Sequence, residues 1–342
     1  AQQQTQDPPF ETLKLKTNLV VVDALVADKK TRELIRNLRL QDFELHEDGQ
    51  HQELEYLSQD KLPLSLLLLL DVSPSVIPVM EEIRNGALQA LQRLKPEDEV
   101  ALMVFSGHAE LIQDFTKDRQ LILIKLSEAL EKTGGGTRIH DAVGQAARQF
   151  KHAILQNSRR VVLVITDNQG SMSRKYDDVS EASVRDAVIE SRATFCGVIA
   201  RSMLNALNGI MMQHPSIQEV TKKTSVNPYV ELTGGEMTAA TKETVNTRLG
   251  EMIDRLRNCY SVGYSPTNQD FNGKFRRVQL TLTPEAKKRL GVETVINARQ
   301  GYYAVTRDNE DILAIAKPAT PAPATDAPAN KPAEVATKTP DA

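Results

Sequence analysis

The hydrophobic residues of this chain follow one pattern near its two ends and another in its middle. Near the ends they form short runs rich in β-branched and aromatic residues, which are typical of strands. Asp48-Gly49 lies between two of these runs and favours a tight hairpin turn, because both residues tolerate positive φ angles. The strands predicted near the ends cover residues 13–26, 43–47, 53–57, 260–264, 276–283, 292–298 and 302–304.

The middle of the chain alternates apolar runs with segments of helical periodicity. The leucines at 66–70 show no alternation with polar residues, as expected of a strand buried on both faces of a parallel sheet. Strands are predicted at residues 64–70, 99–105, 160–166 and 194–199, and helices at residues 79–94, 119–130, 139–150, 180–191, 215–223 and 245–258. This order predicts an α/β fold with a doubly wound, mostly parallel sheet and helices on both faces.

The two patterns together predict that one domain is inserted into another. Residues 61–258 form the α/β domain, and residues 10–60 and 259–305 form a small β-sandwich-like domain, since domain termini usually lie close together. Residues 1–9 are polar and residues 306–342 are rich in Ala, Pro and Thr, so we expect both ends to be disordered. The polar start at Ala1 resembles the end left by removal of a signal peptide, which favours export.

The charge, the apolar segments and the cysteines of the chain limit the kinds of function that the sequence supports. The chain has 42 Lys and Arg residues against 45 Asp and Glu residues, and the basic residues are scattered, so nothing indicates nucleic-acid binding. No apolar stretch approaches the roughly 20 residues of a membrane-spanning helix. Cys196 and Cys259 are too few for a disulfide scaffold, and we expect two separate buried thiols rather than a bridge. The sequence indicates no oligomeric state.

Oxygen-bearing side chains follow the buried strands of the middle segment. Asp71-Val-Ser-Pro-Ser75 comes directly after the leucine run, Thr137 follows three glycines, and Asp167 ends the strand predicted at 160–166. Because ligands of open α/β sheets bind outside the carboxyl ends of the strands, these segments are expected to meet in one crevice. Carboxylate and hydroxyl oxygens suit a hard cation such as Mg²⁺, which keeps part of its water shell.

These segments resemble the von Willebrand factor type A domain. The metal-ion-dependent adhesion site of that family consists of Asp-x-Ser-x-Ser, a Thr on a second loop and an Asp at the end of a later strand. The resemblance implies that the metal ligands are Asp71, Ser73, Ser75, Thr137 and Asp167. It also implies Mg²⁺ as the cofactor, with Mn²⁺ or Ca²⁺ as alternatives, and a protein partner whose exposed Asp or Glu completes the metal shell. Asp141 is either a further residue of the outer shell or a carboxylate directed at its own helix.

The flanking segments resemble an exported bacterial family described as acidobacterial-type. The resemblance rests on residues 19–28, 42–50, 263–268, 273–277 and 298–304, and it implies a periplasmic, extracellular or cell-surface location. Three positions depart from the usual pattern of the family. Pro74 and Asn168 stand where Gly is common, and Val76 stands where Met is common. None of the three replaces a metal ligand, but Pro74 stiffens the loop before Ser75.

Several alternatives compete with metal-dependent binding. Asp71, Ser73 and Ser75 could cap the following helix, or the metal site could be vestigial in a structural or assembly scaffold. A phosphotransferase-type hydrolase would need a second Asp where Ser73 stands, and no Gly-x-Ser-x-Gly or phosphate-binding Gly-Lys-Ser/Thr motif is present. His108, His140 and His152 are far apart in the sequence and do not indicate a histidine-based metal site. We therefore predict a protein that is not an enzyme and acts in binding or adhesion.

Overall fold

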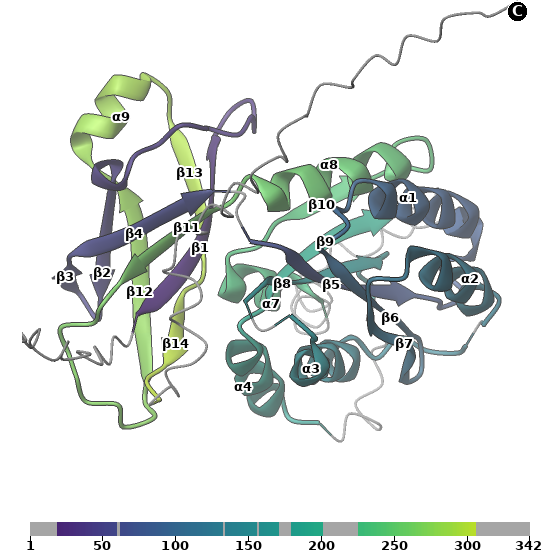
Figure 1. The fold of residues 1–342 in the computed structure, drawn as a ribbon. Helices are drawn as coiled ribbons and strands as arrows, with labels where there is room; N and C mark the ends of the chain where they lie inside the picture. Colours follow the sequence, from purple (N-terminus) through teal and green to yellow (C-terminus); the bar gives the residue numbers. More distant parts are fainter. Residues whose placement is uncertain are drawn as a thin grey trace, which may run out of the picture.

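The computed structural model describes residues 19–59, 62–132, 134–155, 157–170, 179–200 and 225–305. These residues form two units that lie side by side, one all-β and one α/β (Figure 1). The predicted disordered ends and the helix predicted at 215–223 lie outside the described residues.

The α/β unit surrounds a six-stranded sheet with the strand order β10-β9-β8-β5-β6-β7. Neighbouring strands run parallel except at the edge, where β7 is antiparallel to β6. The strands are β5 (Leu64–Asp71), β6 (Glu99–Phe105), β7 (Ala109–Thr116), β8 (Arg159–Thr166), β9 (Thr194–Ala200) and β10 (Met237–Ala240). The predicted fold class, a mostly parallel sheet within an α/β fold, is confirmed.

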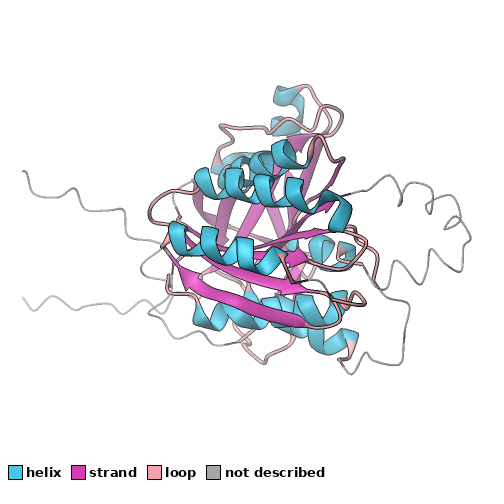
Figure 2. Cartoon of the chain, turned by 90° about the vertical axis from the view of Figure 1, so that its right-hand side faces the viewer, coloured by secondary structure: helices cyan, strands magenta, loops and turns pink. Residues whose placement is uncertain are grey.

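Helices cover both faces of this sheet, as Figure 2 shows. Those in the core on one face are α1 (Met80–Gln92), α2 (Arg119–Leu130) and α8 (Val245–Arg257), and those on the other are α3 (Ile139–Gln149), α4 (Glu181–Ser191) and α7 (Asn227–Thr233). Leu66, Leu68 and Leu70 pack into the first core and Leu67 and Leu69 into the second, because successive side chains of a strand point to opposite faces. The leucine run therefore supplies both cores.

The all-β unit is a sandwich made from both ends of the described chain. Its two sheets have the orders β13-β1-β11-β4 and β14-β12-β2-β3. The elements are β1 (Val20–Asp28), β2 (Phe43–Glu47), β3 (Gln50–Gln52), β4 (Leu54–Gln59), β11 (Tyr260–Tyr264), β12 (Phe275–Leu282), α9 (Pro284–Leu290), β13 (Thr294–Ala298) and β14 (Gly301–Tyr303). Strands from before and after the α/β unit pair directly, β1 with β11 and β2 with β12.

Short 3₁₀ helices complete the described elements. They are η1 (Leu40–Asp42), η2 (Ile77–Val79) and η3 (Phe150–His152). None of the helices in the described part of the chain combines the length and apolarity that crossing a membrane requires.

The hairpin turn at Asp48-Gly49 is confirmed, but its second strand differs from the prediction. Asp48 and Gly49 have φ angles of 48° and 83°, and the short strand β3 pairs with β2. The segment predicted at 53–57 belongs to β4, which instead pairs with β11 in the other sheet. The alternation of side chains cannot show that a chain changes sheets, because it is the same in either sheet.

The elements that the prediction missed include β7, α7 and α9. β7 lies at the sheet edge and is mostly half-buried, so its alternation is weak. α7 and α9 have seven residues each, too few for a clear helical period. Their ends carry signals that could have revealed them: Thr283 caps α9, each helix has Pro in its first turn, and each ends at a glycine with positive φ, Gly234 or Gly291.

Candidate metal site

Asp71 is the last residue of the central strand β5 and is fully buried. Its Oδ1 accepts a hydrogen bond from the backbone N–H of Ser73 at 2.9 Å, and its Oδ2 accepts one from the Thr166 hydroxyl at 2.6 Å. Thr166 lies beside Asp71 because β5 and β8 are parallel neighbours with Leu70 opposite Ile165. The role of Thr166 was not predicted, since only the strand register reveals it.

The charge of Asp71 is poorly compensated within the protein. The pKa of this carboxyl is raised to about 6. Burial is the largest cause and the nearby Asp167 carboxylate acts in the same direction, while the hydrogen bonds from Ser73 and Thr166 lower the pKa. Among the described residues, no basic side chain is one of the main causes of this shift. A cation at this position would therefore stabilise the ionised form.

Ser73 and Ser75 lie next to Asp71 and next to each other. Their hydroxyl oxygens are 3.1 Å apart, and Ser73 is buried. The interpretation of this segment as a helix cap is wrong, because the residue that precedes α1 is Val79 and it makes no side-chain capping bond. The two hydroxyls therefore do not cap α1.

The glycine loop before Thr137 is held against the ends of β5 and β6. The Gly134 N–H donates to the Val72 carbonyl at 3.4 Å, and the Arg138 N–H donates to the Ser106 carbonyl at 2.8 Å. A side chain at Gly134 would place its Cβ 2.1 Å from the Ser106 hydroxyl, so any other residue here would require the Ser106 side chain to move. Thr137, which lies between these two anchors, is buried.

Asp167 follows β8 and is buried, and its Oδ1 accepts a hydrogen bond from the Gln169 N–H at 3.1 Å. The next residue, Asn168, has a φ angle of 60°. This left-handed conformation explains why the family commonly has Gly there, and Asn is among the few other residues that adopt it readily. The departure at Asn168 therefore preserves the backbone that follows Asp167.

Asp141 is partly buried near the start of α3 and accepts a hydrogen bond from Gln145 on the same helix at 3.0 Å. This contact is the one expected of a helix-directed carboxylate. An outer-shell role for Asp141 stays a prediction.

The chemistry of the donor set fits a hard cation. Within the described ranges, no group of three or more His, Cys, Asp or Glu side chains could hold a metal. The predicted set differs, because it combines two buried carboxylates with three hydroxyls, which is the oxygen-only chemistry that Mg²⁺ prefers. Metal binding by these five residues stays a prediction.

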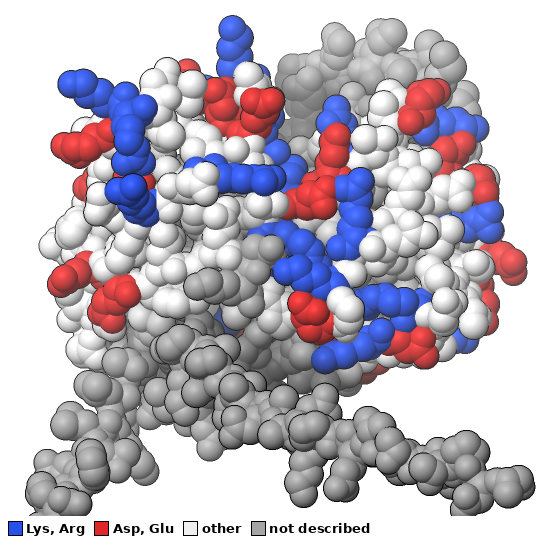
Figure 3. All heavy atoms as spheres, turned by 45° about the horizontal axis from the view of Figure 1, so that its top comes forward, with Lys and Arg blue, Asp and Glu red and all other residues white. Residues whose placement is uncertain are grey.

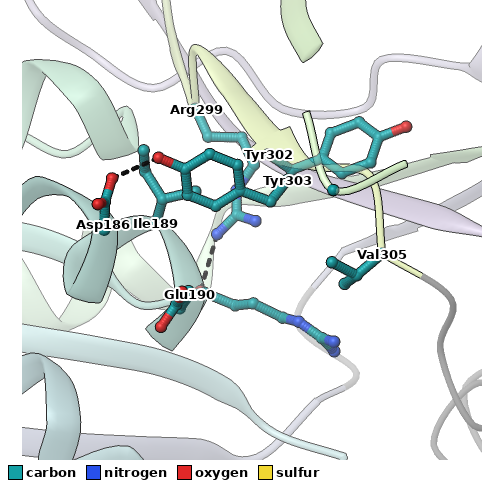
Figure 4. Close-up of a pocket in the computed structure, with 9 residues that line it drawn as sticks. Asp186, Ile189, Glu190, Arg299, Tyr302, Tyr303 and Val305 are labelled. Atoms are coloured by element: carbon teal, nitrogen blue, oxygen red, sulfur yellow. Dashed lines mark hydrogen bonds between the residues drawn. The ribbon is translucent and has the colours of Figure 1, made fainter. Parts of the chain in front are cut away.

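Two larger cavities lie elsewhere, where the two units meet. One of about 460 Å³ is lined by residues of α4 and of the segment around β14, and there the Tyr303 hydroxyl donates to Asp186 and Arg299 donates to the Arg192 carbonyl (Figure 4). The other, of about 450 Å³, lies between Arg32 and α8. Neither is lined by a predicted metal ligand, whereas a hollow of about 80 Å³ beside the candidate site is lined by Val72, Ser106 and Gly134 among others.

The charged surface is mixed. On the face that Figure 3 shows, Lys and Arg side chains lie among Asp and Glu side chains, and neither sign forms a broad patch. This face lacks the continuous basic surface that is typical of nucleic-acid binding.

Comparison with known proteins identifies the α/β unit. Residues 66–170, from β5 to the loop after β8, match the sequence model of the von Willebrand factor type A domain. The chain contains a von Willebrand factor type A domain. The predicted family resemblance is thereby confirmed for this unit, and the matched stretch includes all five predicted ligands of the type A domain. Domains of this family mediate interactions between proteins.

Three solved structures match part of this chain at low sequence identity. BatB from Bacteroides thetaiotaomicron is 18% identical, with 56% of this chain and 98% of that chain covered and a TM-score of 0.38. The corresponding domain of the type V pilus tip protein Mfa5 from Porphyromonas gingivalis is 9% identical, with 56% and 94% covered and a TM-score of 0.41. Proximal thread matrix protein 1 of the mussel byssus is 14% identical, with 61% and 50% covered and a TM-score of 0.43. No curated protein matches the sequence.

Proposed function

We propose that this chain is an exported, non-enzymatic binding protein whose type A domain holds Mg²⁺ and uses it to bind an acidic side chain of a protein partner. The observation that carries the proposal is Asp71, a fully buried carboxylate next to two serine hydroxyls and near a second carboxylate. In the part of the chain that the structure describes, no basic side chain is one of the main causes of its pKa shift. The proposed ligands are Asp71, Ser73, Ser75, Thr137 and Asp167.

The chain's own residues prepare the site in this proposal. The Ser73 N–H and the Thr166 hydroxyl each bond one oxygen of Asp71 and so fix its orientation. Such supporting contacts matter because they hold a metal ligand in its binding geometry. A bound Mg²⁺ would offset the charges of Asp71 and Asp167 and offer a coordination position to the partner's carboxylate. Mn²⁺ or Ca²⁺ would serve in the same way with different affinity.

The proposal also states that the protein catalyses no reaction and that it is exported. A phosphotransferase-type hydrolase is disfavoured because the neighbour that would act as acid and base is Ser73 rather than an aspartate. Export to the periplasm, the extracellular space or the cell surface, and a role in adhesion, are supported by the resemblance of the flanking segments to the acidobacterial-type family. The alternative function is a structural or assembly scaffold in which the metal site is vestigial.

Calorimetry with Mg²⁺ and Mn²⁺ separates the two functions. We expect the wild-type chain to bind one ion, and Asp71→Ala or Thr137→Ala to reduce the affinity by at least about tenfold. Asp254→Asn is a matched control, because it removes a carboxylate from an exposed ion pair with Arg93. Its metal affinity should equal that of the wild type. No binding by the wild type, or unchanged binding by Asp71→Ala, would favour the scaffold.

Partner binding is tested with the same variants. We expect capture of proteins from envelope and extracellular fractions by the immobilised chain to be lost in chelator and in Thr137→Ala, and retained in Asp254→Asn. Partners that bind equally well in chelator would contradict a metal-bridged contact.

A further inference from the structure

Helix α7 contacts two of the segments that carry predicted metal ligands. The first contact is to Asn168, the residue after Asp167. The Asn168 side-chain oxygen accepts from the Val226 N–H at 2.9 Å, and its amide nitrogen donates to the Asn227 side-chain oxygen at 3.0 Å. Asn168 thus joins the loop after β8 to the start of α7 through both ends of its amide.

The second contact joins α7 to α3, the helix that begins just after Thr137. The His140 Nδ1 and the Tyr229 hydroxyl oxygen are 2.6 Å apart, and the two rings meet edge to face with their centroids 5.8 Å apart. Tyr229 is buried. The contact is therefore a short polar link between a buried tyrosine and a half-buried histidine.

α7 is itself fixed to the sheet and to the β-sandwich. The Thr233 hydroxyl oxygen accepts from the Phe195 N–H of β9 at 2.9 Å. The Leu232 carbonyl accepts from the Gln300 N–H of the sandwich at 3.0 Å. Val226, at its start, is fully buried. A segment anchored at both ends can hold its neighbours at a set distance from each other.

We propose that α7 is a bracket that sets the spacing between the Thr137 segment and the Asp167 segment, with Asn168 and Tyr229 as its positioning residues. The proposal rests on the proposed metal function. Neither residue is a metal ligand; each acts by holding a ligand-bearing segment before the ion arrives. Holding the ligands in place beforehand raises affinity because less order has to be created on binding.

Two conservative variants test the bracket. Asn168→Gly keeps the left-handed backbone and removes both side-chain bonds. Tyr229→Phe keeps the ring and removes the hydroxyl that meets His140. We expect each to weaken Mg²⁺ binding by about 10-fold or more, the range typical of residues that support metal ligands.

Tyr303→Phe is the matched control, because it removes a tyrosine hydroxyl bonded to Asp186 at the junction of the two units. Its Mg²⁺ affinity should stay within about twofold of the wild type. If Asn168→Gly and Tyr229→Phe also bind Mg²⁺ like the wild type, the bracket proposal is overturned, whatever their thermal stability.

Amide hydrogen exchange in chelator provides a readout that needs no metal. Through α7, Asn168→Gly should speed exchange at residues 134–141, and Tyr229→Phe should speed exchange at residues 166–170. If each variant changes only the segment that it contacts directly, α7 is not a bracket. A wild type that binds no Mg²⁺ would end the proposed metal function, and the exchange result would still decide whether α7 couples the two segments.

Discussion

At the residue scale, Asp71 combines complete burial with hydrogen-bond donors that are all uncharged. The raised pKa of its carboxyl, about 6 in the folded chain, follows from this environment. The folded state therefore binds a proton more tightly than the unfolded chain does. Stability from this group is fully present below its ordinary pKa and is lost as the pH rises through about 6.

We therefore expect Asp71→Asn to remove one pH-dependent contribution to the unfolding free energy of the metal-free protein. Asn retains an oxygen that can accept from the Ser73 N–H, but it has no charge to bury. Relative to the wild type in chelator, the variant should gain about 2 to 3 kcal/mol of unfolding free energy between pH 4 and pH 7, since one pKa unit corresponds to about 1.4 kcal/mol. Urea unfolding at several pH values measures this. If the unfolding free energies of the two proteins changed with pH in the same way, ionised Asp71 would not destabilise the fold.

At the element scale, short segments hold the predicted ligands in position. α7 has only seven residues, yet it touches the segments of two predicted ligands and ends against the sandwich. Its end depends on Gly234, where φ is 72° and an added Cβ would lie 2.1 Å from the carbonyl carbon of Ala298 in β13. The close approach of α7 to β13 thus requires a residue without a side chain.

We expect Gly234→Ala to destabilise the protein far more than Gly291→Ala, its matched control at the end of α9. Both glycines have positive φ, but a Cβ at Gly291 would meet nothing within 4 Å. Gly291→Ala should cost about 1 kcal/mol, the strain of a left-handed alanine, whereas Gly234→Ala should cost at least about 2 kcal/mol more from the clash. Thermal and urea unfolding measure both. Equal losses would mean that α7 can move away from β13.

At the scale of the whole molecule, buried polar contacts join the α/β unit to the sandwich. Glu236, at the start of β10, accepts two hydrogen bonds from Arg255 of α8, and further ones from Arg32 and Asn297 of the sandwich. Arg159 of β8 donates to the Leu256 and Cys259 carbonyls, where α8 leads into β11. The two buried cysteines form no disulfide, as expected, so no covalent bond between them links the units. Burial raises the pKa of both thiols to about 12.

We expect Glu236→Gln to loosen the junction, because it leaves the mostly buried Arg255 without its carboxylate and also removes the partner of the half-exposed Arg32. The loss should be about 2 to 4 kcal/mol, since breaking a buried ion pair leaves an uncompensated charge. Glu293→Gln removes an exposed pair with Lys29 and should change stability little. Calorimetric unfolding measures both, and a Glu236→Gln protein as stable as the wild type would show that the junction does not depend on this cluster.

The pattern of neighbouring residues was enough to predict several strands and helices. The leucine run specified a strand buried on both faces, and predicted helices such as 119–130 form with the same bounds, because apolar periodicity depends only on neighbours along the chain. The placement of Asp71 at the end of β5 follows from the same pattern. The order of oxygen-bearing motifs was enough to predict the type A family, which the match to residues 66–170 confirms.

Tertiary structure decided what depends on residues that are distant in sequence. Strand register and packing place β4 in the other sheet and bring Thr166 within hydrogen-bonding distance of Asp71. Packing also brings α7 into contact with both Asn168 and His140. No local pattern encodes these contacts, because hydrogen bonds between segments form only once the sheet has aligned them. The motifs thus indicated which residues form the candidate site, and the fold alone shows what supports them.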